Sequence, residues 1–233
     1  MNRSSAECRD LFSPDETSLR AASAWTCAII TLVSSLQLNV SANGPVTVHG
    51  RLDLNGDTYV PPMFNHDNPI VLAPGDLGWY ARDESEIGVP FPSWVSHSAA
   101  LHPLFEVAPG AILTLRALTL EGGLAPRGGA VFVGEGGTLI AHRVVFTKNT
   151  ALRGGAVYAD YGTALEFSWC HFVENWASWE SGAVSVDANA TLTFDASIAE
   201  RNLAGFGAAF VGINFFTRTT EFYGISVKVL SSE

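Results

Sequence analysis

Two consecutive stretches of this chain are near-copies of each other, and their spacing restricts the fold more than any other feature. Residues 127–151 read RGGAVFVGEGGTLIAHRVVFTKNTA, and residues 153–177 read RGGAVYADYGTALEFSWCHFVENWA. The same spacing, between 25 and 27 residues, extends to the recurring asparagines Asn149, Asn175 and Asn202 and to the recurring glycines Gly129, Gly155, Gly182 and Gly207. Self-similarity at a period of about 20–50 residues is typical of stacked structural units.

Inside each unit, apolar residues alternate with other residues, shift by one position and alternate again. Two successive rows are Leu139, Ala141, Val144, Phe146 and Leu165, Phe167, Cys170, Phe172. A further alternating pair precedes each row: Val131/Val133, Val157/Ala159, Val184/Val186 and Ala209/Val211. Alternation predicts strands, because successive side chains of a strand point to opposite faces. We therefore predict three short strands and three turns per unit, which is one coil of a parallel β-helix with equivalent residues about 4.8 Å apart.

The recurring glycines and asparagines have different expected roles at the corners of such a coil. We expect the glycines where a Cβ atom would clash or where φ must be positive. The asparagines are expected to point inward, and a buried amide needs hydrogen-bond partners. A vertical row of identical amides supplies those partners.

The same pattern is also compatible with a competing fold. The stretch FSWCHFVEN also fits the leucine-rich repeat, whose period overlaps this one. That fold needs a helix or an extended return segment after the asparagine. Here the return segment RGGAVYADYGT contains three glycines and an alternating strand, which disfavours a helix. We therefore prefer the β-helix.

The motifs GGAV at 128–131 and 154–157, with FTKN at 146–149 and FVEN at 172–175, resemble a known repeat. They are similar to the paired GGA[ILV] and FxxN repeats of polymorphic outer membrane proteins, which are right-handed β-helices of the pectin-lyase-like superfamily. The resemblance covers residues 127 to about 208 and weakens toward its end. It implies a surface-exposed module that mediates adhesion.

The regions outside the repeat suggest a domain organisation. We expect residues 1–23 to form an N-terminal cap or tail, with a helix capped by Asp15 or Ser13, and residues 24–233 to form a single β-helix domain. Residues 59–103 break the period and predict a long loop insertion. The apolar stretch 24–40 is too short and too polar for a membrane span and is interpreted as strand. The sequence leaves open whether Cys8 and Cys27 pair.

Charge and composition exclude some functions. Hydrophobic residues make up 47% of the chain and charged residues 15%, which suits a folded core rather than disorder. The formal net charge of −10 argues against nucleic acid as a partner. Cys170 lies at an inward position and is expected to be a buried small residue rather than a reactive thiol.

Candidate sites are few. Trp79, Tyr80 and Trp94 lie among carboxylates in the insertion, and Phe132 and Tyr158 should stack outward in one column, so all five are candidate binding residues. Glu166 and His171 are the best candidate catalytic pair, although two polar residues on a solvated wall are the commoner explanation. No metal-ligand spacing is evident, and we expect no cofactor. N-x-[ST] occurs at Asn2, Asn39 and Asn189, of which Asn189 lies in a turn.

These observations favour a noncatalytic, extracellular or cell-surface β-helix module, adhesin-like, that is part of a larger chain and binds protein or glycan partners. The alternative is a polysaccharide lyase or glycoside hydrolase of the pectin-lyase-like superfamily, acting between the insertion and the wall that carries Glu166 and His171. A structural spacer without a specific ligand is a third hypothesis.

Overall fold

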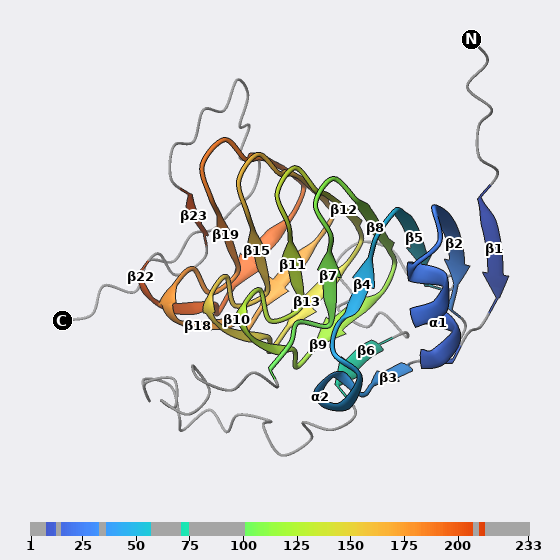
Figure 1. Ribbon diagram of the computed structural model, residues 1–233. Coiled ribbons are helices and arrows are strands. Elements are labelled where there is room, and N and C mark those ends of the chain that lie inside the picture. The colour runs from blue at the N-terminus through green and yellow to red at the C-terminus, as the bar shows by residue number, and fades with distance from the viewer. Residues whose placement is uncertain are drawn as a thin grey trace, which may run out of the picture.

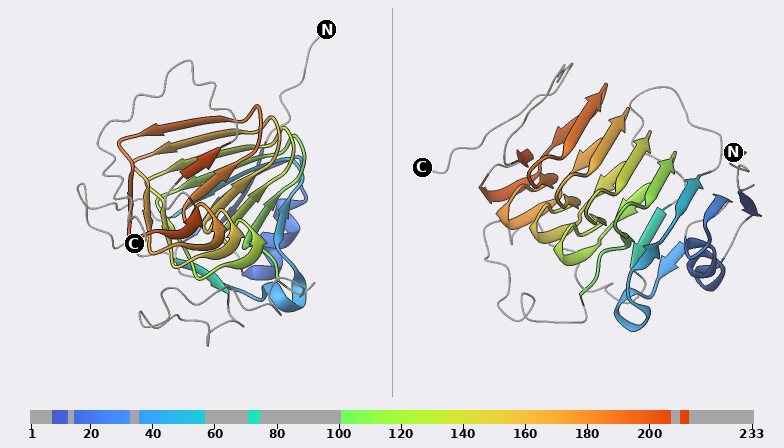
Figure 2. Two further views of the ribbon diagram at one scale, coloured as in Figure 1. Left: turned by 90° about the vertical axis from the view of Figure 1, so that its left-hand side faces the viewer. Right: turned by 45° about the horizontal axis from the view of Figure 1, so that its top comes forward.

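The computed structural model describes residues 8–12, 15–32, 36–56, 71–74, 101–206 and 210–212. These residues form a right-handed parallel β-helix of about 5 turns, with helix confined to the N-terminal part. The coils stack in chain order along one axis, from blue to orange in Figures 1 and 2. The predicted fold class is therefore confirmed.

The strands form four parallel sheets, which we name A to D. In the described residues sheet A comprises β1 (Arg9–Phe12), β2 (Cys27–Thr31), β5 (Arg51–Asn55), β8 (Ile112–Arg116), β12 (Thr138–His142), β16 (Ala164–Ser168) and β20 (Thr191–Asp195). Sheet B comprises β3 (Leu36–Leu38), β6 (Val71–Pro74), β9 (Thr119–Glu121), β13 (Val145–Thr147), β17 (His171–Val173) and β21 (Ile198–Glu200).

Sheet C comprises β4 (Val46–Val48), β7 (Phe105–Val107), β11 (Val131–Val133), β15 (Val157–Ala159), β19 (Val184–Val186) and β23 (Phe210–Gly212), and most of it faces the viewer in Figure 1. Sheet D comprises β10 (Leu124–Arg127), β14 (Thr150–Arg153), β18 (Trp176–Glu180) and β22 (Leu203–Phe206). From β7 onward, each coil passes through sheets C, A, B and D in that order.

The sequence predicted three strands per coil, but each coil from β7 to β22 has a fourth strand, which lies in sheet D. Sheet D lies between the asparagine and the glycine pair, where residues such as Thr150–Arg153 show little hydrophobic alternation. The pairing of residues in the other sheets follows the sequence repeat, for example Leu139 with Leu165 and Phe146 with Phe172. The last pairing differs from the prediction, because Phe210 and not Ala209 is the partner of Val184. That coil keeps 26 residues between partners, whereas the glycine spacing suggested 25.

From β7 to β22, each corner between consecutive strands contains one residue with left-handed backbone. The four columns of such residues, with φ from 45° to 72°, are Gly110, Gly136, Gly162 and Asn189; Ala117, Arg143, Trp169 and Ala196; Gly122, Lys148, Glu174 and Arg201; and Gly128, Gly154 and Ser181. The second column is the predicted bend between the two halves of each apolar row. A left-handed residue turns the chain sharply, so one per corner is enough to close the coil.

The recurring asparagines form a continuous hydrogen-bonded ladder inside the corner between sheets B and D. The Oδ1 atom of Asn175 accepts from the backbone N–H of Asn149 at 3.0 Å and from its Nδ2 at 2.9 Å. The Nδ2 atom of Asn175 donates to the Phe146 carbonyl at 2.9 Å and to Oδ1 of Asn202 at 2.9 Å. Asn149 and Asn175 are fully buried, so the ladder satisfies polar groups that water cannot reach.

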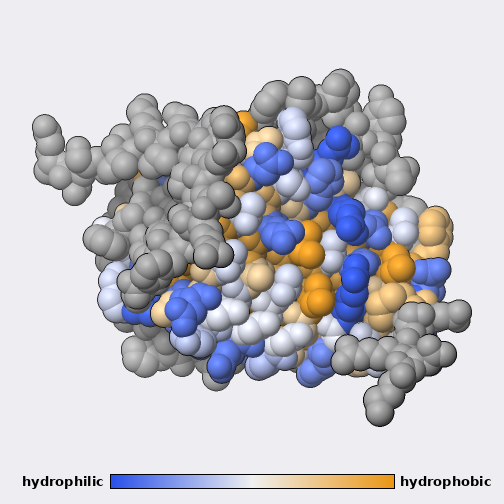
Figure 3. All heavy atoms as spheres, turned by 90° about the horizontal axis from the view of Figure 1, so that it is seen from above, coloured by the Kyte–Doolittle hydropathy of each residue, from blue (hydrophilic) through white to orange (hydrophobic). Residues whose placement is uncertain are grey.

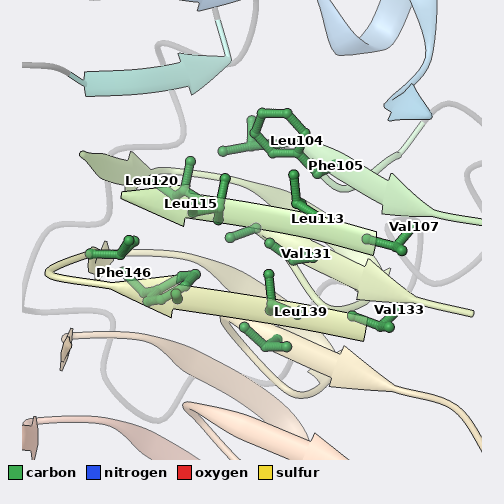
Figure 4. Packing of buried hydrophobic residues seen from close by; sticks show 14 of the residues in the cluster. Leu104, Phe105, Val107, Leu113, Leu115, Leu120, Val131, Val133, Leu139 and Phe146 are labelled. Carbon is green, nitrogen blue, oxygen red and sulfur yellow. The ribbon is translucent and has the colours of Figure 1, made fainter. Parts of the chain in front are cut away.

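The interior is packed by aliphatic and aromatic columns. Figure 4 shows Leu113, Leu139 and Phe146 directed into the space between the sheets, and all three are fully buried. The rings of Phe146 and Phe172 stack with centroids 4.6 Å apart, and Phe167 packs edge-on against both. Burial of each such side chain contributes about 1.5–3 kcal/mol.

The N-terminal coils are covered by helix α1 (Glu16–Ser23), with Asp15 at its N-cap accepting from the backbone N–H of Ser18 at 2.7 Å. Leu19 of this helix is buried in the core cluster. A short helix α2 (Val40–Asn43) follows β3. A disulfide joins Cys8, directly before β1, to Cys27 at the start of β2.

The predicted insertion at residues 59–103 contains β6, which pairs with β3 and β9 in sheet B. The segment is thus interrupted by a strand of the stack. The candidate binding residues Trp79, Tyr80 and Trp94 lie outside the described residues. The leucine-rich repeat alternative is wrong, because its return segment after the asparagine is built here from strands β14 and β15.

Replacing the middle rung of the ladder should be costly. Asn175→Ala leaves buried groups of Asn149 and the Phe146 carbonyl without their partner, so we expect a loss of about 3 kcal/mol or more in the free energy of unfolding. The measurement is urea unfolding followed by circular dichroism. Thr193→Ala, at an exposed position of β20, is the control and should change stability by less than about 0.5 kcal/mol. Equal effects would show that the ladder contributes little.

Two glycines of one coil should respond differently to alanine. A Cβ atom on Gly155 would lie 2.2 Å from the Gly182 carbonyl oxygen, so Gly155→Ala must separate the coils and should lose more than about 3 kcal/mol. Gly162 has φ +68° but no atom within 4 Å of its Cβ position, so Gly162→Ala should lose about 1–2 kcal/mol through backbone strain alone. Urea unfolding of both variants tests this order, and the reverse order would contradict the close approach of the coils.

Candidate functional site

One coil contains an extra residue, and the structure places it in sheet D. Ala151 pairs with Ala177, but the next partners along β14 and β18 are Arg153 and Glu180, so β18 bulges by one residue. The register shifts back between β18 and β22. Bulges re-aim side chains and are frequent beside functional sites. This bulge contains Trp179, whose side chain is 58% exposed.

The bulged tryptophan has a cationic partner from the preceding coil. The guanidinium carbon of Arg153 lies 4.2 Å from the ring centroid of Trp179, within the range of a cation–π contact. The Nε atom of Arg153 is also 3.6 Å from Oε2 of Glu180. Oε1 of that carboxylate accepts a hydrogen bond from the Ser185 hydroxyl at 3.0 Å. The guanidinium is therefore held between a ring and a carboxylate.

A second aromatic pair lies on the adjacent sheet C. The rings of Phe132 and Tyr158 are stacked with centroids 5.9 Å apart and an interplanar angle of 3°. Arg127, the register neighbour of Arg153, lies over both rings at 4.9 and 5.2 Å. The Tyr158 hydroxyl donates to Asp187 at 2.9 Å. Burial, together with this hydrogen bond, raises the pKa of Tyr158 above its ordinary value, so the phenol stays neutral and keeps donating at physiological pH.

These residues form one surface feature around the corner between sheets D and C. We name it the arginine–aromatic cluster, and its members are Arg127, Phe132, Arg153, Tyr158, Trp179, Glu180, Ser185 and Asp187. Tyr158 is only 3% exposed and supports the others, whereas Trp179 and Arg127 are exposed. Within the described ranges Arg127 makes no ion pair with a carboxylate, and its exposed guanidinium lies over the Phe132 and Tyr158 rings. Exposed rings beside guanidinium groups can stack on a sugar or bind a carboxylate.

The candidate catalytic residues occupy successive strands but different sheets. Glu166 lies on β16 of sheet A and is exposed, whereas His171 lies on β17 of sheet B and is buried. The Nε2 atom of His171 lies 3.2 Å from Oε1 of Glu200. Arg201 in turn contacts both Glu200 and Glu174, at 3.5 and 3.2 Å. His171 thus lies beside a carboxylate that is itself paired with Arg201.

Another polar contact lies at the end of the sheet A strands. The Nδ1 atom of His142 is 2.8 Å from the Ser168 hydroxyl of the next coil. Burial, followed by the positive charges of Arg143 and Arg116, lowers the pKa of His142 below its ordinary value. Trp169, at the corner that follows β16, is 41% exposed. In Figure 3, hydrophilic and hydrophobic residues are interspersed over the described part of the face shown, as on a solvated wall.

Cys170 is a core residue. Its thiol is buried and donates to the Ala141 carbonyl at 3.3 Å. Burial raises the pKa of Cys170 to about 12. The thiol is therefore protonated at neutral pH, and the nucleophilic thiolate is absent.

The sequence pattern pointed to Phe132 and Tyr158 but not to Trp179, Arg127 or Arg153. A signal for Trp179 was present, because the distance from asparagine to the following glycine grows by one residue between Asn175 and Gly182. An added residue in a strand repeat indicates a bulge. The arginines gave no such signal, since contacts between side chains of adjacent sheets depend on the angle at the corner.

The described residues hold no group of three or more histidine, cysteine or acidic side chains able to bind a metal ion. None of the helices in these ranges has the length and apolar character to cross a membrane. Comparison of the chain with protein-family models, curated proteins and solved structures found no match.

The buried thiol gives a direct test of the core assignment. With the Cys8–Cys27 disulfide intact, iodoacetamide at pH 8 should leave the folded protein unlabelled and should modify Cys170 once urea unfolds the chain. Intact mass spectrometry measures both states. Rapid labelling of the folded protein would contradict the burial of Cys170 and its raised pKa.

Proposed function

We propose that this chain is a noncatalytic β-helix module of an extracellular or cell-surface protein, and that it binds glycan partners through the arginine–aromatic cluster. The observation that carries the proposal is the bulge of β18, which projects Trp179 from the wall and against Arg153. A strand that only completed the coil would need no extra residue. The stacked Phe132 and Tyr158 extend the same feature onto sheet C.

The chemistry of the cluster favours an acidic sugar. An exposed indole offers a flat apolar face on which the C–H side of a sugar ring can stack, as apolar surfaces do in binding sites. Arg127 and Arg153 present planar donors that suit a carboxylate. Glu180, Ser185 and Asp187 supply acceptors or a hydroxyl for sugar hydroxyl groups. Neutral sugars would use the ring and the acceptors but not the arginines.

The Cys8–Cys27 disulfide supports the proposed location. Disulfides form and persist in oxidising compartments and are rare in reducing ones. This one joins the beginning of β1 to β2, at the end of the stack. A surface or secreted protein is the ordinary context for such a bond.

The family placement is part of the same proposal. The GGAV and FxxN motifs lie at the glycine corner and the asparagine ladder of successive coils, and these two features would be required of any chain with polymorphic outer membrane protein-like repeats. A pectin-lyase-like origin is consistent with the parallel coils. An adhesin-like role follows from this placement and from the cluster together.

Glycan binding is testable with matched tryptophan variants. We expect the purified full chain to bind uronic acid-containing oligosaccharides on an array more strongly than neutral ones. Trp179→Ala should weaken that binding about tenfold, equivalent to about 1.4 kcal/mol. Trp169→Ala is the control, since Trp169 is also exposed but lies at the corner between sheets A and B, and it should change affinity less than twofold.

Each other outcome has a distinct meaning. Equal losses in Trp179→Ala and Trp169→Ala would place the binding elsewhere, and no binding to any glycan would refute the glycan proposal. Release of shortened oligosaccharides would instead favour the polysaccharide lyase or hydrolase, and Glu166→Gln and His171→Ala would then be the first variants to assay.

A further inference from the structure

The chain contains three asparagines in the N-x-[ST] pattern, and two of them have different surroundings in the structure. Asn39 stands in the sequence Asn39–Val40–Ser41 and is the N-cap of α2, where its Oδ1 accepts from the backbone N–H of Ala42 at 3.2 Å. Its own backbone N–H donates to Glu16 at 3.0 Å. The side chain of Asn39 is thus engaged in local structure. Asn2 lies outside the described residues.

Asn189, in the sequence Asn189–Ala190–Thr191, has a different setting. It lies at the exposed corner between β19 and β20, and both Asn189 and Thr191 are exposed. Its Nδ2 donates to the hydroxyl of Tyr161, an exposed residue of the preceding coil. This hydrogen bond lies at an exposed site and uses one of the two N–H groups of the amide.

The corner column provides an independent comparison. The positions equivalent to Asn189 in the preceding coils are Gly110, Gly136 and Gly162, all with positive φ. Asparagine is among the few residues other than glycine that tolerate this backbone, so conformation alone permits Asn189 without requiring it. Two residues after these corners stand Ile112, Thr138, Ala164 and Thr191, so among the four corners Asn189 alone combines an asparagine with a threonine two residues later.

We propose that Asn189 is an N-glycan acceptor site of this protein. Nδ2 of Asn189 forms a bond to the anomeric carbon of the first sugar, supplied by a lipid-diphosphate-linked oligosaccharide. The bond from that carbon to the diphosphate oxygen breaks, the diphosphate leaves with the electron pair, and the proton lost by the amide nitrogen balances the charge of the released diphosphate. The exposed ring of Tyr161 lies beside the attached sugar. The disulfide supports passage through a compartment where this transfer occurs. The proposal is independent of the ligand proposed for the arginine–aromatic cluster.

The test is expression of the full chain through the secretory pathway of a eukaryotic host. We expect the intact mass to exceed that of the polypeptide by one glycan. Peptide N-glycosidase should remove the excess and convert Asn189 to aspartate, which peptide mapping locates. If the chain is not secreted, the purified folded protein is incubated with a single-subunit oligosaccharyltransferase and a lipid-linked oligosaccharide, and the same mass increase is expected.

Three variants isolate the site without disturbing the fold. Asn189→Gly restores the residue of the column and should lose the glycan while keeping the melting temperature. Thr191→Val keeps Asn189 and the shape of its neighbour but lacks the hydroxyl, and it should lose the glycan too. Asn39→Asp keeps a good N-cap and should retain the glycan.

The results that overturn the proposal are equally specific. An unmodified wild-type chain in both assays would do so. Retention of the glycan in Thr191→Val, or its loss in Asn39→Asp, would place the modification at another residue. A glycan present only on unfolded protein would show that the corner does not present the amide.

Discussion

Flush stacking of the coils is the constraint on which the rest of the structure depends. Parallel strands of adjacent coils pair residue by residue, so each coil must close with nearly the same length and the same corners. From β7 to β22 the corners achieve this with one left-handed residue each, in columns that repeat along the stack. The corner between sheets B and D also has a buried side, which water cannot reach, and there the asparagine ladder supplies the hydrogen bonds. The apolar interior follows from this stacking, because the stacking places equivalent inward-facing residues of successive coils directly above one another.

The fold was largely predictable from the sequence because its rules are local and periodic. Alternation at Leu139, Ala141, Val144 and Phe146 indicates both the strands and the bend between them, and the repeat then supplies the pairing. Sheet D escaped prediction because its strands carry small or polar residues and lack that alternation. The register predicted for β23 was wrong by one residue, because it was inferred from the spacing of the glycines, which does not follow the strand pairing strictly.

The candidate site was predictable only in part. Phe132 and Tyr158 share a column, and columns can be read from a repeat. The contact of Arg153 with Trp179 joins two coils and a bulge, and it depends on where an added residue is accommodated. Exposure was the least predictable property, because Tyr158 alternates as an outward residue yet is covered by its neighbours. Burial on the outer wall is decided by long side chains from the adjacent sheet.

The bulge in β18 has a consequence for how such a chain can vary. Sheets A, B and C keep their register through the longer coil, while sheet D takes up the added residue and returns to alignment in the next strand. Sheet D can therefore absorb a change in coil length without altering the pairing in the other three sheets. Insertions that arise during evolution, or peptides that protein engineers graft into the chain, would be tolerated best in sheet D, because the strand pairing of sheets A, B and C would be kept.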